Sequence, residues 1–218
     1  IKHRPLNIEE ISDSNNKLYS EKTISRLEDY SQFCKVDLNR SWMINNKYVP
    51  SIRTIVEETT AMIGKNDNRF VSLMHGDPCF SNILYDFKSK SIKLIDPRGM
   101  DANGRVTIYG DFRYDVAKLA HSVLGLYDFI IGGIFNYHEN SPYDLCFDIP
   151  INKDIRDTQE YFKSLTFGEY SLNELNTFPI MINLFLSMLP LHKDNPTRQK
   201  ALLANALRLY VEMFELNK

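Results

Sequence analysis

The sequence predicts a mainly helical domain of the α+β class, with a small β-hairpin inserted between its helices. Apolar residues recur at helical spacing over most of the chain. Two short β-prone runs, 82–86 and 91–96, are joined by a turn at 87–90. At 218 residues, 43% hydrophobic and 25% charged, the chain has the size and composition of a soluble globular protein with a sizeable core.

The N-terminal part predicts two helices after a polar segment. Residues 1–20 show no sustained period, so we expect a linker or a surface-wrapping segment, followed by a single domain over 21–218. The first helix is indicated by apolar residues at helical spacing, namely Ile24, Leu27, Tyr30, Phe33 and Cys34. Pro50 suits the first turn of the second helix. Its buried side is expected to carry Ile52, Ile55, Val56, Thr59, Met62 and Ile63, and the polar residues 64–68 end it.

The central part predicts the hairpin. Residues 70–74 form a β-like run that leads into a short loop, and the strands 82–86 and 91–96 follow. Because the first strand starts at Asn82 and the second ends at Asp96, pairing the strands brings these two side chains to one end. The polar, glycine-containing residues 99–110 are expected to form a loop beside that end, where a substrate can be contacted.

The C-terminal part predicts further helices and a second, smaller hairpin. A helix is expected from Tyr114 to about Gly125, because its apolar residues follow helical spacing. The alternation in 135–138 and 143–147 indicates the second hairpin. The remaining expected helices span 158–165, 172–189 and 197–216.

Charge, cysteines and hydropathy exclude several classes of protein. A net charge of −2 gives no electrostatic reason to expect nucleic acid or an anionic membrane as a partner. Three scattered cysteines without a C-x-x-C pair indicate reduced thiols in a cytoplasmic protein. The most apolar stretch, 178–191, is interrupted by Pro179 and Asn183 and predicts a buried helix rather than a membrane span.

The chemistry-bearing residues lie in two segments, His-Gly-Asp-Pro-Cys-Phe-Ser-Asn at 75–82 and Ile-Asp-Pro-Arg at 95–98. Phosphoryl transfer needs a metal to offset charge, a positioned hydroxyl and a carboxylate that receives its proton. Asp77 can be that carboxylate while Asn82 turns toward a metal, and Asp96 adds the anionic oxygen ligand that Mg²⁺ prefers.

These segments resemble the catalytic loop and the metal-binding segment of the aminoglycoside phosphotransferase and choline kinase family, small-molecule kinases with the protein-kinase fold. The resemblance implies that Asp77 is the catalytic base and that Asn82 and Asp96 hold Mg²⁺ beside ATP. It is specific over 71–118 and weaker in the helices on both sides.

The same resemblance implies two supporting residues. His75 matches the histidine that packs and orients the loop, and Asp115 matches a helix residue that braces the loop through backbone hydrogen bonds. Arg98 departs from the family pattern. We assign it to cofactor binding through a phosphate; contact with an acidic substrate group and a pair with Asp101 are the alternatives. Arg98 could also join Arg105 and Arg113 in an anion-binding cluster; the alternative is that each of the three forms an ordinary surface ion pair.

One part of the family pattern is missing. Family members carry a β-rich nucleotide lobe with a strand lysine before the catalytic loop, whereas here Gly64 is the only glycine before Gly76 and the first 70 residues indicate coil and helices. We therefore expect a kinase-like C-terminal lobe of a larger protein, whose partner is an upstream lobe of the same gene product. The isolated chain need not be active.

The expected function is an Mg-ATP-dependent phosphotransferase acting on a hydroxyl of an amino sugar, a sugar or a choline-like molecule. Ile-Asp-Pro-Arg-Gly at 95–99 also resembles kinase-like domains of bacterial surface-polysaccharide gene clusters. Two alternatives remain. One is a non-catalytic binding or scaffold module. The other is a metal-dependent hydrolase using His75, Asp77 and Asp96, for which the sequence offers no further histidine ligand nearby.

Overall fold

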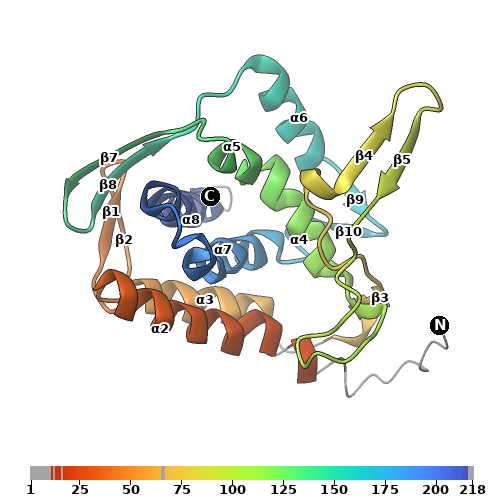
Figure 1. Cartoon of the computed structure of the whole chain (residues 1–218), viewed down its shortest axis with the longest axis horizontal. Coiled ribbons are helices and arrows are strands. Elements are labelled where there is room, and N and C mark those ends of the chain that lie inside the picture. Colours follow the sequence, from red (N-terminus) through yellow and green to blue (C-terminus); the bar gives the residue numbers. More distant parts are fainter. Residues whose placement is uncertain (1–10, 12, 16, 65–66, 216–218) are drawn as a thin grey trace.

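The computed structural model describes residues 11, 13–15, 17–64 and 67–215, which form helices around a buried central helix. Helix α7 (Thr177–Ser187) lies at the centre, and every one of its residues is buried. Around it pack α2 (Lys22–Cys34), α3 (Ile52–Ile63), α4 (Phe112–Val123) and α8 (Pro196–Glu215) (Figure 1). A helix that is apolar on all sides is stable only inside a core, which accounts for the position of α7.

Shorter helical segments connect these elements. They are a π-helical turn at Lys17–Glu21, α5 (Tyr127–Ile131), α6 (Lys153–Lys163), and 3-10 turns at Asn68–Phe70, Phe80–Asn82 and Leu189–His192. The helix expected at 158–165 begins at 153 because the Asn152 side chain caps it, accepting from the Ile155 N–H at 2.9 Å. The helix expected from 172 begins at 177, after a left-handed residue at Asn176. Residue 216 lies outside the described residues.

A four-stranded sheet covers one side of the helices, in the order β2 (Lys47–Val49), β1 (Trp42–Ile44), β8 (Asp144–Asp148), β7 (Asn136–Ser141). The β7–β8 pair confirms the second expected hairpin. The sequence reasoning missed β1 and β2, whose turn residues Asn45 and Asn46 both have positive φ, as a two-residue hairpin turn requires. It also missed the parallel pairing of β1 with β8.

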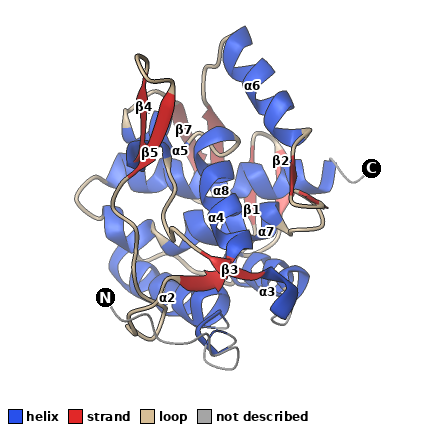
Figure 2. Ribbon diagram, turned by 90° about the vertical axis from the view of Figure 1, so that its right-hand side faces the viewer, coloured by secondary structure: helices blue, strands red, loops and turns tan. Residues whose placement is uncertain are grey.

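The other strands of the described residues form three two-stranded sheets, and an isolated bridge joins Met100 to Val106. The main expected hairpin is present as β4 (Ile83–Asp86) and β5 (Ser91–Leu94), and it projects from the helical body (Figures 1 and 2). Strand β3 (Val71–Leu73) pairs with β6 (Tyr109–Asp111), and β9 (Thr166–Phe167) pairs with β10 (Tyr170–Ser171). The chain is therefore α+β as expected, but its β part is larger than a single inserted hairpin.

The two N-terminal helices bury most of the expected residues, with three exceptions. Leu27 and Tyr30 of α2 are buried, as are Ile52, Ile55, Val56, Thr59 and Ile63 of α3. Ile24, Phe33 and Met62 are exposed, because α2 and α3 meet α7 along narrower faces than the spacing indicated. Of the expected linker 1–20, residues 1–10, 12 and 16 lie outside the described residues, whereas the described Tyr19 is buried against Tyr114.

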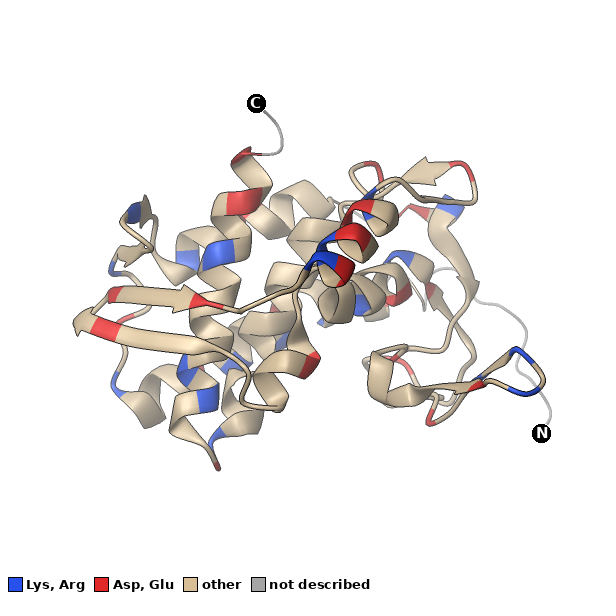
Figure 3. Cartoon of the chain, turned by 90° about the horizontal axis from the view of Figure 1, so that it is seen from above, with Lys and Arg blue, Asp and Glu red and all other residues tan. Residues whose placement is uncertain are grey.

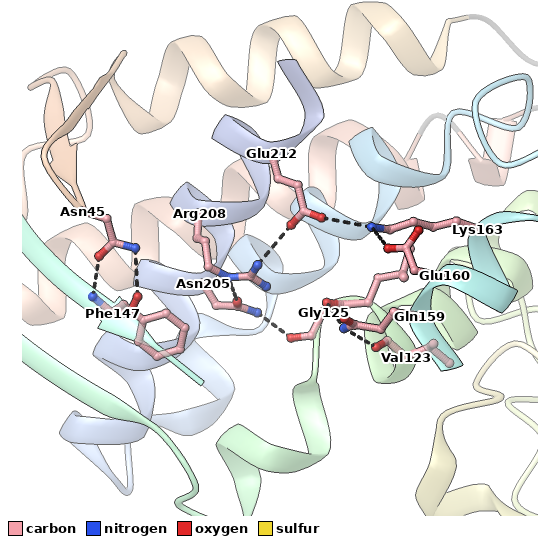
Figure 4. A network of polar contacts seen from close by, with 11 residues as sticks. Asn45, Val123, Gly125, Phe147, Gln159, Glu160, Lys163, Asn205, Arg208 and Glu212 are labelled. Atoms are coloured by element: carbon pink, nitrogen blue, oxygen red, sulfur yellow. Dashed lines mark hydrogen bonds and ion pairs between the residues drawn. The ribbon is translucent and has the colours of Figure 1, made fainter. Parts of the chain in front are cut away.

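A polar network ties α8 to the end of α4 and to α6 (Figure 4). The Asn205 amide donates to the Gly125 carbonyl at 2.7 Å, and Arg208 pairs with Glu212 at 3.0 Å. Gly125 also lets the Phe185 ring of α7 lie against this turn, because a Cβ there would be 2.6 Å from that ring. The network fixes the C-terminal end of α4 and so helps to position the helix.

The start of α4 is fixed by a buried ion pair. Arg113, 2% exposed, contacts the Asp111 carboxylate at 2.6 Å and donates to the Ile63 carbonyl at 3.1 Å. Its guanidinium also lies 4.5 Å from the centre of the Phe70 ring. Every strong partner of Arg113 is therefore inside the protein, and its place in an exposed anion-binding cluster was wrong.

Charged residues of both signs are interspersed over the helices and loops (Figure 3). This pattern agrees with a net charge near zero. Within the described ranges, no helix combines the length and the apolar character needed to cross a membrane.

Candidate functional site

The loop 75–82 connects β3 to β4, and the carboxylate of Asp115 on α4 holds its beginning. The backbone N–H of His75 donates to Asp115 Oδ2 at 2.7 Å, and that of Gly76 donates to Oδ1 at 2.8 Å. Burial raises the pKa of Asp115, although the two backbone donors act in the opposite direction. The bracing geometry that the resemblance implied for Asp115 is thus present.

Gly76 lets the segment 95–98 lie directly against this loop. Its φ is +82°, and a Cβ at this position would lie 2.7 Å from the Arg98 Cβ. At this contact the Arg98 N–H donates to the His75 carbonyl at 2.9 Å. Both the backbone conformation and the space therefore require glycine.

We expect Gly76→Ala to lower the free energy of unfolding by about 1–3 kcal/mol and to displace Arg98. Gly133→Ala is the matched control, because Gly133 also has a positive φ of +74° but has no atom within 4 Å of its Cβ position. Chemical denaturation of both variants separates backbone strain from the clash. Equal losses in the two variants would show that the contact with Arg98 is unimportant.

Asp77 and Asn82 lie in contact within the loop. Asn82 Nδ2 donates to the Asp77 carbonyl at 2.9 Å and lies 3.5 Å from the Asp77 Oδ2. The 3-10 turn Phe80–Asn82 brings the chain back toward Asp77, with the Asn82 N–H bonded to the Cys79 carbonyl. With Nδ2 used internally, Asn82 Oδ1 is the atom left to bind a metal.

Asp96 is the residue after Ile95, which is hydrogen-bonded to Asn82. The Ile95 N–H donates to the Asn82 carbonyl at 3.0 Å, one step beyond the Ile83–Leu94 pair of the hairpin. Asp96 itself is exposed, and its φ of +54° places it in the left-handed region. Among the described residues its carboxylate has no hydrogen-bond or ion-pair partner.

The structure therefore brings the three residues to the same end of the β4–β5 hairpin. Asn82 Oδ1 and the Asp96 carboxylate are hard oxygen donors, the set that suits Mg²⁺ completed by water and phosphate oxygens. Asp77 lies next to Asn82 and is partly exposed.

Lys118 on α4 is a site residue that the sequence reasoning missed. Its Nζ lies 2.6 Å from Asp77 Oδ1, and its side chain is only 12% exposed. Burial alone would lower the pKa of Lys118, but Tyr114 and Asp77 outweigh it, so the pKa is raised. The available signal was a lysine one helical turn after Tyr114, within the apolar run Val116 to Ala120.

Arg98 binds a tyrosine rather than an acidic residue. Its Nη2 donates to the Tyr114 hydroxyl at 2.7 Å, and its Cζ lies 4.6 Å from the centre of that ring. Asp101 instead pairs with Arg105 at 2.7 Å. The alternative pair of Arg98 with Asp101 was wrong, and Arg98, Arg105 and Arg113 do not form one cluster.

The remaining polar residues of the loop have supporting positions. His75 Nδ1 accepts from the Asp77 N–H at 3.3 Å, so the imidazole lies against the loop backbone. Cys79 is buried, with its Sγ 3.2 Å from Ser81 Oγ.

His121 of α4 is buried between the rings of Tyr127 and Phe185, and burial lowers its pKa well below the usual value. Across the described ranges, no group of three or more His, Cys, Asp or Glu could hold a metal.

Comparison of the chain with models of protein families, with curated proteins and with solved structures finds no significant match. The site is therefore interpreted from its own geometry.

Proposed function

We propose that the chain is the catalytic, kinase-like lobe of an Mg-ATP-dependent phosphotransferase that acts on a hydroxyl of a small molecule. The single observation that carries the proposal is that Asp77, Asn82 and Asp96 lie at one end of the hairpin. Asn82 contacts Asp77 and is hydrogen-bonded to Ile95, the residue before Asp96. A proton acceptor and two oxygen donors for a hard cation meet there. Bacterial surface-polysaccharide metabolism is the setting that Ile-Asp-Pro-Arg-Gly suggests.

The proposed reaction is an in-line displacement. Asp77 accepts the proton of the acceptor hydroxyl while the oxygen of that hydroxyl forms a bond to the γ-phosphorus of ATP. The bond from that phosphorus to the β–γ bridging oxygen breaks, and ADP leaves. Mg²⁺, when bound by Asn82 and Asp96, supplies positive charge that offsets the charge of the phosphate oxygens.

The neighbouring residues hold this arrangement in place. Lys118 fixes the Asp77 Oδ1 by their ion pair, and Oδ2, with only the long 3.5 Å contact to Asn82 Nδ2, is the oxygen that faces the hydroxyl in this proposal. Asp115 fixes the loop backbone through His75 and Gly76. Positioning of this kind supplies much of the rate enhancement in phosphoryl transfer, because the protein contributes little covalent chemistry.

A non-catalytic binding module is the second candidate, and one observation favours it. The described residues before β3 form α2, α3 and the short β1–β2 pair, not a β-rich nucleotide lobe. The phosphotransferase proposal therefore needs the nucleotide lobe to come from elsewhere in the gene product. A metal-dependent hydrolase is less well supported, since the described residues offer no cluster of three acidic, histidine or cysteine ligands.

Replacement of Asp96 tests the proposed metal site. We expect Asp96→Asn to weaken Mg-ATP binding by the full gene product about tenfold or more, because it removes the only anionic ligand proposed. Asp157→Asn, on the exposed face of α6, is the matched control. Titration calorimetry with Mg-ATP measures both variants. Unchanged affinity in Asp96→Asn would argue against a metal role for this residue.

A further inference from the structure

We propose that the acceptor alcohol carries an anionic group, which binds to Lys22 and Arg26 of α2 while its hydroxyl lies at Asp77. This inference rests on the proposed function and names the class of its substrate. It is carried by a cationic pocket next to the candidate site. We call this pocket the α2 pocket.

The α2 pocket, with a cavity volume of about 30 Å³, lies between α2, α4 and α7. Its polar lining comes from Lys22, Arg26, Tyr114, Asn183 and Ser187. Arg26 Nη1 donates to the Ser187 carbonyl at 3.1 Å, which fixes the guanidinium at the pocket wall. Lys22 and Arg26 are one helical turn apart, so their side chains reach the same side of α2.

Tyr114 connects the α2 pocket to the catalytic loop. Its hydroxyl accepts from Arg98 Nη2 at 2.7 Å, and its ring lines the pocket. Lys118 lies one turn further along α4 and contacts Asp77 Oδ1 at 2.6 Å. Helix α4 therefore presents Tyr114 to the α2 pocket and, one turn later, Lys118 to the proposed catalytic base.

The charges around the α2 pocket and Asp77 are not balanced. Lys22, Arg26, Arg98 and Lys118 contribute four positive charges, whereas the neighbouring carboxylates are Asp77 and Asp115. Asp77 already pairs with Lys118, and Asp115 accepts the two loop N–H groups. In the part of the chain that the structure describes, no carboxylate forms an ion pair with Lys22, Arg26 or Arg98.

Holding these cations together is unfavourable for the folded chain. Burial, and then the charges of Arg26, Arg98 and Lys118, lower the pKa of Lys22 to about 8, and Asp77 only partly opposes them. The excess is local, since the chain as a whole has a net charge of −2. Partly buried, unpaired cations beside a proposed base are typical of a site for an anion.

The α2 pocket is tested by binding measurements on the protein without nucleotide. Titration calorimetry at millimolar concentrations compares glycerol 3-phosphate with glycerol, and glucuronate with glucose. We expect the anionic member of at least one pair to bind and neither neutral member to bind. The pair that responds distinguishes a phosphate from a carboxylate. Equal behaviour of the anionic and neutral members in both pairs would overturn the proposal.

Variants of α2 locate the binding. Lys22→Gln and Arg26→Gln should each weaken binding of the anion about tenfold or more, because each removes a charge-assisted hydrogen bond. Lys153→Gln, whose side chain is 86% exposed on α6, is the control and should leave the affinity unchanged. Circular dichroism verifies that each variant is folded. Undiminished binding by folded Lys22→Gln and Arg26→Gln would place the anion elsewhere and refute the α2 pocket.

The pH dependence distinguishes a binding role of Lys22 from a structural one. Affinity for glycerol 3-phosphate should fall as the pH rises through about 8, because Lys22 then loses its proton. The groups that face Lys22 are Arg26, Arg98, Lys118, Asp77 and the phenols of Tyr19 and Tyr114. The pKa values of Arg98 and Lys118 are raised, so both stay protonated in this range, and the raised pKa of Tyr19 keeps its phenol neutral. The phosphate, with a second pKa of about 6, stays doubly ionised. The profile should become flat in Lys22→Gln, and an unaltered profile would contradict the assignment.

Phosphoryl transfer from Mg-ATP separates this proposal from the one on which it rests. Transfer by the full gene product to glycerol 3-phosphate or glucuronate, but not to glycerol or glucose, supports both. Transfer to the neutral alcohols alone refutes the anionic acceptor while the phosphotransferase stands. Binding of the anions without transfer to any acceptor refutes the phosphotransferase, while the calorimetry still establishes the α2 pocket.

Discussion

Replacing Asp77 by asparagine should lower kcat of the full gene product by a factor of about 10²–10⁴. Asparagine has nearly the same shape but cannot take the proton of the acceptor hydroxyl. It also cannot pair with Lys118, whose Nζ now lies 2.6 Å from Asp77 Oδ1. Affinity for Mg-ATP should change little, since the proposed metal ligands are Asn82 and Asp96. The expected signature is thus a loss of kcat with an almost constant nucleotide affinity.

Steady-state kinetics and nucleotide titration of Asp77→Asn provide the check. Lys118→Met is an informative companion, because it removes the ion pair but leaves the carboxylate. We expect Lys118→Met to lose less activity than Asp77→Asn. Near-normal turnover by Asp77→Asn would remove Asp77 from the mechanism. A larger loss in Lys118→Met would assign the main chemical role to the lysine.

Replacing Arg113 by methionine should lower the free energy of unfolding by about 3–5 kcal/mol. The substitution leaves Asp111, 1% exposed, as a buried carboxylate without its partner. It also removes the donor to the Ile63 carbonyl and the contact with Phe70. Because Asp111 ends β6 and caps α4, the loss should loosen the helix that carries Asp115 and Lys118.

Chemical denaturation measures this effect, and two further variants interpret it. Lys153→Met, in the exposed pair with Asp157, should leave stability nearly unchanged. The double variant Asp111→Leu with Arg113→Met should recover part of the loss, because no unpaired charge remains. A loss in Arg113→Met no larger than that in Lys153→Met would show that the buried pair does not hold α4.

The central hairpin and the grouping of Asp77, Asn82 and Asp96 could be predicted because they depend on local sequence. A two-stranded antiparallel pair with a short turn fixes which residues meet at its ends. Asn82 and Asp96 are 14 positions apart, and the turn at 87–90 determines that they approach. The buried α7 was equally visible, since its apolar residues leave no polar face.

The cationic side of the site could not be predicted in the same way. Lys22 and Arg26 precede Asp77 by more than fifty positions and reach it only because α2 packs against α7. Lys118 lies among apolar residues, and only the approach of the loop to α4 gives it a partner. Parallel pairing of β1 with β8 spans about a hundred residues, so no turn signal indicates it. For Arg113 the sequence left an anion-binding cluster and ordinary ion pairing open, because its burial depends on Asp111, Ile63 and Phe70 together.

Crystals grown with Mn²⁺ and a non-hydrolysable ATP analogue provide the most direct measurement, through the anomalous scattering of manganese. The site geometry predicts a peak at about 2.2 Å from both Asn82 Oδ1 and the Asp96 carboxylate, with the γ-phosphate beside Asp77. A metal bound elsewhere, or a nucleotide whose γ-phosphate lies away from Asp77, would contradict the proposed phosphotransferase.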